Sequence, residues 1–339
     1  MAEESLRELE SLARSAGAQT VVSELFSLHR PDPALLLGKG KVPLLQEKIS
    51  RNHIDIVLFD ETLSPVQQRN WENFLGVKVM DRTALILDIF AQRAKTREGQ
   101  LQVELAQANY LLPRLTGKGV SLSRLGGGIG TRGPGETKLE MDRRQIRTRI
   151  GYLQRELERV RQARSLQRRR RQEKGLPMVA LVGYTHAGKS TLFNQLTGAR
   201  ISVEDRLFST LDPTLRRLRL NEKQTVVLSD TVGFIRKLPH LLVEAFRATL
   251  EEVVQATLIL HVVDASSQEV EEQIQAVQEV LKEIGTGDKP SLIVWNKIDN
   301  LKNAHPSERM ERKWGEGVEI SAKLGQNLHI LKQKIADLT

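Results

Sequence analysis

Cysteine is absent from this 339-residue sequence, which excludes disulfide bonds and thiolate metal sites. No apolar stretch approaches the roughly 20 residues that a membrane-spanning helix needs. The acidic N-terminus, Met1 to Ser5, lacks the basic, apolar and cleavage regions of a signal peptide. We therefore expect a soluble, cytoplasmic and monomeric protein with no membrane span, long enough for two or three domains.

Acidic residues are scarce in one window, residues 143–171, which holds twelve arginines against two acids, Glu156 and Glu158. That window carries +10, whereas the whole chain carries +9, so the remainder is about neutral. A charged helix face is usually just solvated. Here the acids needed for internal pairing are few and Arg168 to Arg171 are consecutive, so we favour binding to a polyanion such as RNA.

A phosphate-binding loop is predicted at Gly183-Tyr-Thr-His-Ala-Gly-Lys-Ser190, between an apolar run ending at Val182 and a helical pattern from Thr191. Glycines let successive backbone N–H groups point at phosphate oxygens, and the positive end of the following helix faces the same anion. Lys189 can reach the β- and γ-phosphates, and the Ser190 hydroxyl can ligate Mg²⁺. A glycine turn with an incidental lysine is the simpler alternative.

Three later segments favour the nucleotide interpretation, each at the end of a predicted strand. The first is Asp230-Thr-Val-Gly233, where Asp230 can hold Mg²⁺ through water and the Gly233 N–H can approach a γ-phosphate. The second is Asn296-Lys-Ile-Asp299, whose last carboxylate suits the N–H donors of guanine and rejects adenine. The third is Ser321-Ala-Lys323, whose backbone can support guanine O6.

These four motifs, in this order, resemble those of Ras-like GTPases of the translation-factor-related class. The run Gly126 to Glu140 is more specific, because GGGIGTRGPGETKLE resembles the signature of the HflX family. The segments Phe208 to Thr214 and Asp230 to Pro239 resemble the same family. The resemblance covers nearly the whole chain. It implies a GTPase that binds the large ribosomal subunit and its RNA, with GTP or GDP and Mg²⁺ as cofactors.

The resemblance also completes the set of expected site residues. Thr210 is the implied switch residue and second hydroxyl ligand of Mg²⁺, with Thr214 as the fallback in the same loop. We expect chemistry at Lys189, Thr210 and Gly233, and metal ligands at Ser190, Thr210 and Asp230. Nucleotide contacts are expected at Gly183, Tyr184, Thr185, His186, Ala187, Gly188, Lys189, Ser190, Thr191, Phe208, Ser209, Thr210, Leu211, Asp212, Asp230, Thr231, Val232, Gly233, Asn296, Lys297, Ile298, Asp299, Ser321, Ala322 and Lys323.

Two positions depart from the family pattern. Many GTPases place a water-orienting glutamine after the Asp-x-x-Gly motif, but this chain has Phe234, so we expect slow intrinsic turnover, with the attacking water ordered by backbone, by another residue or by a partner. The family resemblance implies that the ribosome is the stimulating partner. HflX relatives usually carry asparagine where His186 stands, and imidazole is a poor potassium ligand, which argues against stimulation by a monovalent cation. Many family members also carry a further C-terminal domain, which we do not expect within these residues.

The predicted architecture is α/β, with a Ras-like GTPase domain at 176–339 after a small α/β subdomain at 1–95 and a helical hairpin at 96–175. In the first part we expect strands at 20–27, 54–59 and 77–80, and a helix from Pro65 capped by Ser64. Alternating strands and helices indicate a parallel sheet. Because no catalytic constellation converges on this part, a binding module is favoured; whether ATP also binds there stays open.

Two long helical patterns predict the hairpin. Apolar residues from Leu101 to Leu115 and from Ile146 to Val160 repeat at spacings of three and four, so each helix needs a partner. Pro113 is expected to kink or end the first helix. The glycine-rich connection, 117–135, is interpretable as a flexible linker or a second nucleotide site. Its interleaved cations, Lys118, Arg124, Arg132 and Lys138, lead us to favour contact with folded RNA. An RNA chaperone, a tRNA-modification accessory and a non-catalytic scaffold remain the alternatives.

Overall fold

The computed structural model describes residues 2–115, 134–172, 175–199, 207–208, 210–237, 239, 247–301 and 313–339. Side chains are described for these residues except at 134–139, 165–172 and 247–249. Residues 117–133 of the glycine loop predicted at 117–135, and the side chains of Arg168 to Arg171, therefore lie outside the described parts. The chain forms two compact units: unit 1 is Met1–Gln92 with Gln100–Arg159, and unit 2 is Arg93–Gly99 with Val160–Thr339.

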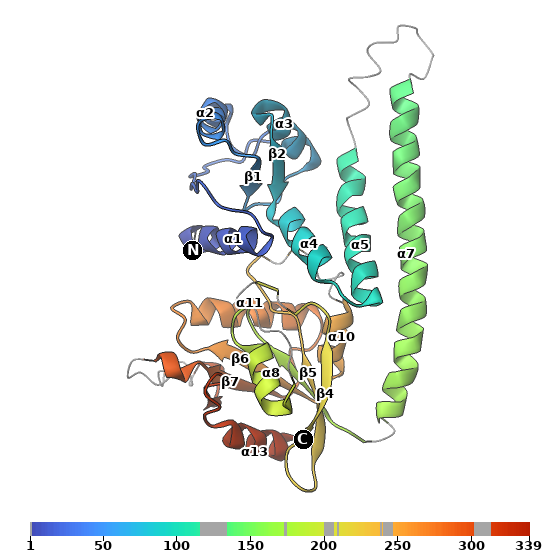
Figure 1. Cartoon of the computed structure of the whole chain (residues 1–339), viewed down its shortest axis with the longest axis vertical. Helices are drawn as coiled ribbons and strands as arrows, with labels where there is room; N and C mark the ends of the chain where they lie inside the picture. The colour runs from blue at the N-terminus through green and yellow to red at the C-terminus, as the bar shows by residue number, and fades with distance from the viewer. Residues whose placement is uncertain are drawn as a thin grey trace. The chain divides into compact units, whose positions relative to one another are not determined.

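Unit 1 begins with helices and a small parallel sheet (Figure 1). Its strands, β1 and β2, pair in register from Ile56↔Lys78 to Phe59↔Asp81, as the alternating pattern predicted. The elements, in chain order, are α1 (Ala2–Ser15), the 3-10 turn η1 (Lys39–Lys41), α2 (Val42–Asn52), β1 (Ile56–Phe59), α3 (Pro65–Leu75), β2 (Lys78–Asp81) and α4 (Arg82–Arg93).

Local chemistry explains the bounds of α3. The Ser64 hydroxyl accepts the Gln67 N–H at 3.2 Å, and the Gln67 side chain accepts the Ser64 N–H at 2.9 Å. This reciprocal capping box, with Pro65 in the first turn, fixes where the helix starts. Gly76 ends it with a φ of 69°, a left-handed conformation that favours glycine. The sequence predicted the start of this helix at Ser64 and Pro65.

The strand predicted at 20–27 is wrong, because residues 18–28 form no regular element. Its β-branched and apolar side chains fit a strand locally, yet Val21 and Leu25 are 58% and 51% exposed. A strand needs a partner for its backbone groups as well as suitable side chains. The core of unit 1 is built instead from Leu35, Leu63, Trp71 and Val79.

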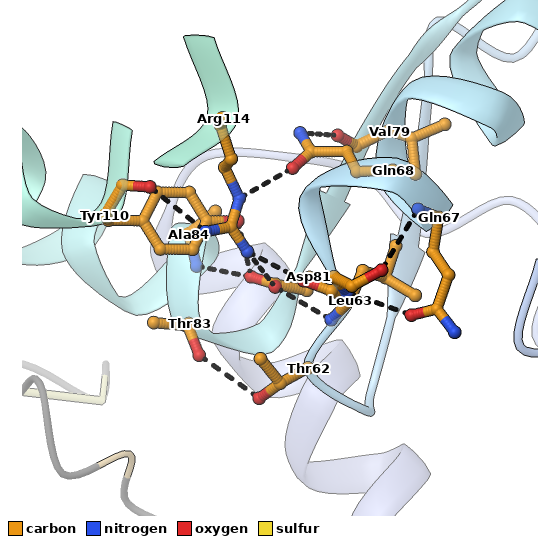
Figure 2. Close-up of polar contacts among 11 residues, drawn as sticks. Thr62, Leu63, Gln67, Gln68, Val79, Asp81, Thr83, Ala84, Tyr110 and Arg114 are labelled. Carbon is orange, nitrogen blue, oxygen red and sulfur yellow. Dashed lines mark hydrogen bonds and ion pairs between the residues drawn. The ribbon is translucent and has the colours of Figure 1, made fainter. Parts of the chain in front are cut away.

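A buried carboxylate, Asp81, connects the sheet of unit 1 to its helices (Figure 2). One oxygen accepts the Ala84 N–H and the Tyr110 hydroxyl, both at 2.9 Å. The other accepts the Leu63 N–H at 3.0 Å and the Arg114 guanidinium at 3.3 Å. The same guanidinium lies 3.4 Å from the centroid of the Tyr110 ring. Every oxygen of this buried charge therefore has protein donors, as burial requires.

Long helices form the predicted hairpin (Figure 1). They are α5 (Arg97–Leu111), followed by the 3-10 turn η2 (Leu112–Leu115), and α7 (Pro134–Gln172). Pro113 lies in η2, so it ends α5 as expected. The Arg149 guanidinium makes two hydrogen bonds to the Glu104 carboxylate, at 2.6 and 2.8 Å, which holds the two helices side by side within unit 1. Leu153 and Leu157 are buried on α7, as the apolar repeat predicted.

Unit 2 contains a six-stranded sheet in the order β4-β5-β3-β6-β7-β8, parallel except for β4 against β5. Its elements are β3 (Met178–Val182), α8 (Lys189–Thr197), β4 (Thr214–Arg219), β5 (Thr225–Asp230), α10 (Arg247–Gln255), β6 (Leu258–Asp264), α11 (Val270–Glu283), β7 (Ser291–Asn296), η3 (Ile298–Asn300), β8 (Gly317–Glu319) and α13 (Leu328–Leu338).

Alternating side chains of β7 show how helices cover both faces of this sheet. Leu292 and Val294 share one core with residues of α8 and α13. Ile293 and Trp295 share another with Ile274 of α11. The carboxyl ends of the parallel strands all open at one edge, where ligands bind in such folds. No helix among the described residues is long and apolar enough to cross a membrane.

Candidate nucleotide site

The loop from Gly183 to Gly188 joins the end of β3 to the start of α8, as the motif predicted. Gly188 adopts a φ of 93°, and a side chain there would collide with the Asn296 amide. Glycine at this position therefore allows the phosphate loop to touch the strand end that carries the base-recognition motif. The Asn296 amide also donates to the Ala187 carbonyl at 2.7 Å, which fixes the loop from the other side.

Lys189 is the first residue of α8, and its ammonium group is buried in the loop. It donates to the carbonyls of Gly183 and Tyr184 at 3.0 and 2.8 Å. Burial lowers the pKa of Lys189 to about 8, although the nearby Asp230 carboxylate opposes that shift. The structure therefore holds a cation beneath the loop and at the positive end of a helix, where an anion is favoured.

Three oxygen-bearing side chains meet beside this lysine. The Ser190 hydroxyl donates to the Asp230 carboxylate at 2.7 Å and lies 3.0 Å from the Thr210 hydroxyl. Thr210 donates to the same carboxylate oxygen at 3.2 Å. Thr210, inferred from family resemblance, is therefore brought to the predicted metal ligands.

Two features of this cluster fit Mg²⁺: its oxygen ligands, and one carboxylate oxygen that has no hydrogen-bond partner among the described residues. Mg²⁺ prefers oxygen ligands such as carboxylates and hydroxyls. Within the described part of the chain, the second carboxylate oxygen of Asp230, Oδ1, is buried without a hydrogen-bond partner. Burial raises the pKa of Asp230, and the Ser190 hydroxyl opposes this. A bound divalent cation would give this oxygen a partner of opposite charge.

The segment after Asp230 pairs with the phosphate loop. The Thr185 N–H donates to the Phe234 carbonyl at 2.8 Å, and the Phe234 N–H donates to the Gly183 carbonyl at 3.1 Å. Gly233 lies so close to Thr185 and Lys189 that a side chain would press on both. The Phe234 ring is 1% exposed, so it packs inward, in line with the expectation that it does not orient water.

The base-recognition residues also come together. The side-chain amide oxygen of Asn296, Oδ1, accepts the Ala322 N–H at 2.9 Å, which links the second and third predicted motifs. The Asp299 carboxylate accepts the Ser321 hydroxyl at 2.6 Å, so the carboxylate expected to read guanine is oriented by a neighbouring side chain. These two contacts form one surface at the ends of β7 and β8.

One residue of this surface was missed from the sequence. Asp264, which ends β6, accepts the Lys297 ammonium at 2.7 Å and the Ser266 hydroxyl at 2.6 Å. It is not among the residues predicted for the site, whereas its carboxylate holds Lys297, one of the expected nucleotide contacts. Its position at the end of a strand could have indicated this role, because Asp264 pairs with Asn296 across neighbouring parallel strands.

Asp212 is placed differently from its prediction. Its carboxylate accepts the backbone N–H groups of Lys95 and Thr96, each at 2.9 Å, instead of facing the phosphate loop. The two partners precede α5 and are more than a hundred residues away in sequence, so no local pattern could indicate them. Leu211 and Phe208 are buried, and Ser209 lies outside the described residues.

Three family models match the chain in succession. Residues 3–91 match the GTP-binding GTPase N-terminal model, and residues 93–171 match the GTP-binding GTPase middle-region model. Residues 178–297 match a model described as 50S ribosome-binding GTPase. Together the three matches extend from residue 3 to residue 297 with two short gaps.

Curated relatives extend the likeness over most of the chain. The GTPase HflX of Caldanaerobacter subterraneus subsp. tengcongensis is 54% identical over 300 residues, which are 88% of this chain and 70% of the relative. The GTPase HflX of Escherichia coli K12 is 50% identical over 335 residues, 98% of this chain and 79% of the relative. The chain belongs to the HflX family of GTPases.

A solved structure resembles the whole HflX chain. A GTP-binding protein from the hyperthermophilic archaeon Sulfolobus solfataricus, crystallised with GDP, aligns with a TM-score of 0.52 at 27% identity. The alignment covers 100% of this chain and 96% of that one. The HflX family resemblance and the Ras-like α/β fold inferred from the sequence are therefore confirmed, and the protein is a GTP-binding member of a GTPase family.

Proposed function

We propose that this HflX protein hydrolyses GTP to GDP and phosphate with Mg²⁺, as a switch on the large ribosomal subunit. The observation that carries the hydrolytic part is the cluster of Ser190, Thr210 and Asp230 beside Lys189, with an unsatisfied buried carboxylate oxygen. Carboxylate and hydroxyl oxygens of this kind are the ligands that Mg²⁺ prefers.

Phosphoryl transfer needs positioning and charge neutralisation more than covalent help. The loop from Gly183 to Ser190 wraps the phosphates, and Lys189 places a positive charge against the transferring group. Ser190, Thr210 and Asp230 would hold Mg²⁺, which when bound neutralises charge on the β- and γ-phosphates. The Gly233 N–H orients the γ-phosphate. Asp299, oriented by Ser321, selects guanine.

Phe234 sets the expected rate. Its buried ring has no group that could orient the attacking water, so intrinsic turnover is slow and a partner supplies what is missing. We propose that the ribosome is that partner. The support is the description of the matched family model, 50S ribosome-binding GTPase, and the basic window 143–171 of α7.

The hairpin is the proposed RNA-binding arm. We place the domain limits at 1–95, 96–175 and 176–339. The hairpin is the middle domain, so it contains the glycine loop and the arginines of α7. Neutralising Arg168 to Arg171 as alanines is expected to weaken subunit binding and to flatten its salt dependence, because each lost phosphate contact reduces counterion release. A salt titration by filter binding measures both. An unchanged slope would make this face an ordinary solvated surface.

Sedimentation of the full chain with purified large and small ribosomal subunits tests the ribosomal role. With a non-hydrolysable GTP analogue we expect the protein to sediment with the large subunit. With GDP we expect it to dissociate from that subunit. A phosphate-release assay with and without subunits then measures stimulation. Equal sedimentation in both nucleotide states, together with unstimulated hydrolysis, would favour an RNA chaperone or tRNA-modification accessory instead.

A further inference from the structure

The loop that carries Thr210 is anchored on a segment, residues 95–99, that belongs to none of the nucleotide-binding motifs. Asp212 lies two residues beyond Thr210, and β4 begins two residues later at Thr214. Its carboxylate accepts the N–H groups of Lys95 and Thr96, both at 2.9 Å, and also accepts the Thr96 hydroxyl. These partners belong to unit 2, in the segment that leads into α5.

The anchor is shaped for a carboxylate. The Thr96 hydroxyl also accepts the Gly99 N–H at 3.0 Å, as a helix N-cap does, so one hydroxyl both caps α5 and holds Asp212. A side chain at Gly99 would occupy the position of an Asp212 oxygen. The carboxylate therefore sits against the first turn of a helix, where the helix dipole favours negative charge.

The first turn of α5 is fixed from another side as well. Glu98 is buried and pairs with Arg164 of α7 at 2.9 Å, within unit 2. The segment 95–99 is thus held by the Glu98 ion pair and also binds the Asp212 carboxylate. The position of this segment therefore fixes the position of the loop that carries Asp212.

We propose that Asp212 is a positioning residue for the reaction, which sets Thr210 at the metal site through its anchor on Lys95 and Thr96. Two residues span at most about 7 Å, so the anchor on Asp212 limits where Thr210 can lie. The Thr210 hydroxyl has to stay within 3.2 Å of the Asp230 carboxylate to complete the cluster. Thr96, outside the nucleotide-binding motifs, thereby becomes a determinant of Mg²⁺-dependent hydrolysis. The inference rests on the proposed hydrolysis of GTP.

Thr96→Val and Thr96→Ser form the matched test in the full chain. Valine removes the hydroxyl at nearly constant shape, whereas serine keeps it. For Thr96→Val we expect the half-saturating Mg²⁺ concentration for GTP hydrolysis to rise about tenfold, the scale of one lost hydrogen bond to a charged group. GDP affinity is expected to stay within about twofold, because the switch threonine serves the triphosphate state. Thr96→Ser is expected to match the wild type.

A second variant approaches the same contact from the helix. Gly99→Ala replaces glycine by the best helix former, which favours α5, but places a methyl group where Asp212 sits. We expect it to raise the Mg²⁺ requirement as Thr96→Val does, and the double variant to be no worse than either alone, since both displace one carboxylate. A merely structural role predicts instead that GDP affinity falls together with hydrolysis. The urea midpoint of Thr96→Val falls in either case, because the lost hydroxyl also caps α5.

Two failures are distinguishable. If the wild type shows no Mg²⁺-dependent phosphate release, the proposed function fails. If the wild type hydrolyses GTP and Thr96→Val requires the same Mg²⁺ concentration as Thr96→Ser, the positioning role of Asp212 is overturned while the function stands. A fall in GDP affinity that parallels the loss of hydrolysis would overturn the positioning role as well.

Discussion

Two buried aspartates end parallel strands of the two units, and their surroundings differ. Asp81 ends β2, and both of its oxygens receive donors from backbone N–H groups, a tyrosine and an arginine. Asp230 ends β5, where one oxygen receives two hydroxyls and the other, among the described residues, receives none. The chain completes the first carboxylate, whereas the second keeps an oxygen that the proposed Mg²⁺ would contact.

Under the proposed function, this difference distinguishes a carboxylate that stabilises the fold from one that would hold a metal ion. A buried carboxylate without enough donors costs free energy, and its ionised form is disfavoured. Burial accordingly raises the pKa of Asp230. Proteins retain such a destabilising carboxylate at sites where a bound ligand offsets the free-energy cost. The same reasoning applies to Lys189, whose buried ammonium has carbonyl partners and a pKa lowered to about 8.

Lys189→Ala is expected to give the largest effect. Removing the cation that faces the transferring phosphate should reduce GTP hydrolysis by about a thousandfold or more. The fold should persist, because the lost group is a desolvated charge and not a packed apolar one. Phosphate release and urea unfolding measure the two effects, with Lys334→Ala on the exposed face of α13 as control. Hydrolysis near the wild-type rate in a folded variant would remove Lys189 from the site.

Asp81→Asn should act on stability alone. It leaves the Arg114 guanidinium facing an amide instead of a charge, and breaking one side of a buried ion pair costs about 3 kcal/mol. Urea unfolding measures this loss, with the exposed Asp55→Asn as the matched control. The nucleotide affinity of the folded fraction should not change. A stable variant with weakened nucleotide binding would contradict the structural role of Asp81.

Asp299→Asn should lower GTP affinity by about a hundredfold, because an amide donor then faces the N–H donors of guanine. Xanthosine triphosphate, which presents an acceptor there, should become the better ligand. Fluorescence titration with both nucleotides measures the exchange of preference. If GTP affinity is unchanged, guanine is recognised by other groups.

Phe234→Leu should give the smallest effect. The ring packs inward, so a smaller apolar side chain should change intrinsic hydrolysis by less than about tenfold while costing on the order of 1 kcal/mol of stability. Single-turnover phosphate release measures the rate. A loss of about a thousandfold with intact nucleotide affinity would indicate a direct part in the chemistry.

The sequence predicted elements whose causes are local. The phosphate loop follows from glycines between a strand and a helix, and α3 follows from the Ser64 cap and Pro65. The strand expected at 20–27 failed because pairing depends on a partner that local composition does not reveal. The contacts of Asp264 and Asp212 were not predicted for the same reason. Their partners, Lys297 and Thr96, lie 33 and 116 residues away.

Urea unfolding of three proteins tests the contrast between the two aspartates most directly. The wild type, Asp230→Asn and Asp81→Asn are each measured alone and with Mg²⁺ plus a non-hydrolysable GTP analogue. A ligand that binds the folded state raises the unfolding midpoint. We predict that Asp81→Asn starts lower and keeps the full Mg²⁺-dependent rise. Asp230→Asn should start at or above the wild type and lose that rise. If Asp230→Asn instead starts lower and keeps the Mg²⁺-dependent rise, Asp230 is a structural charge like Asp81 and does not hold the metal.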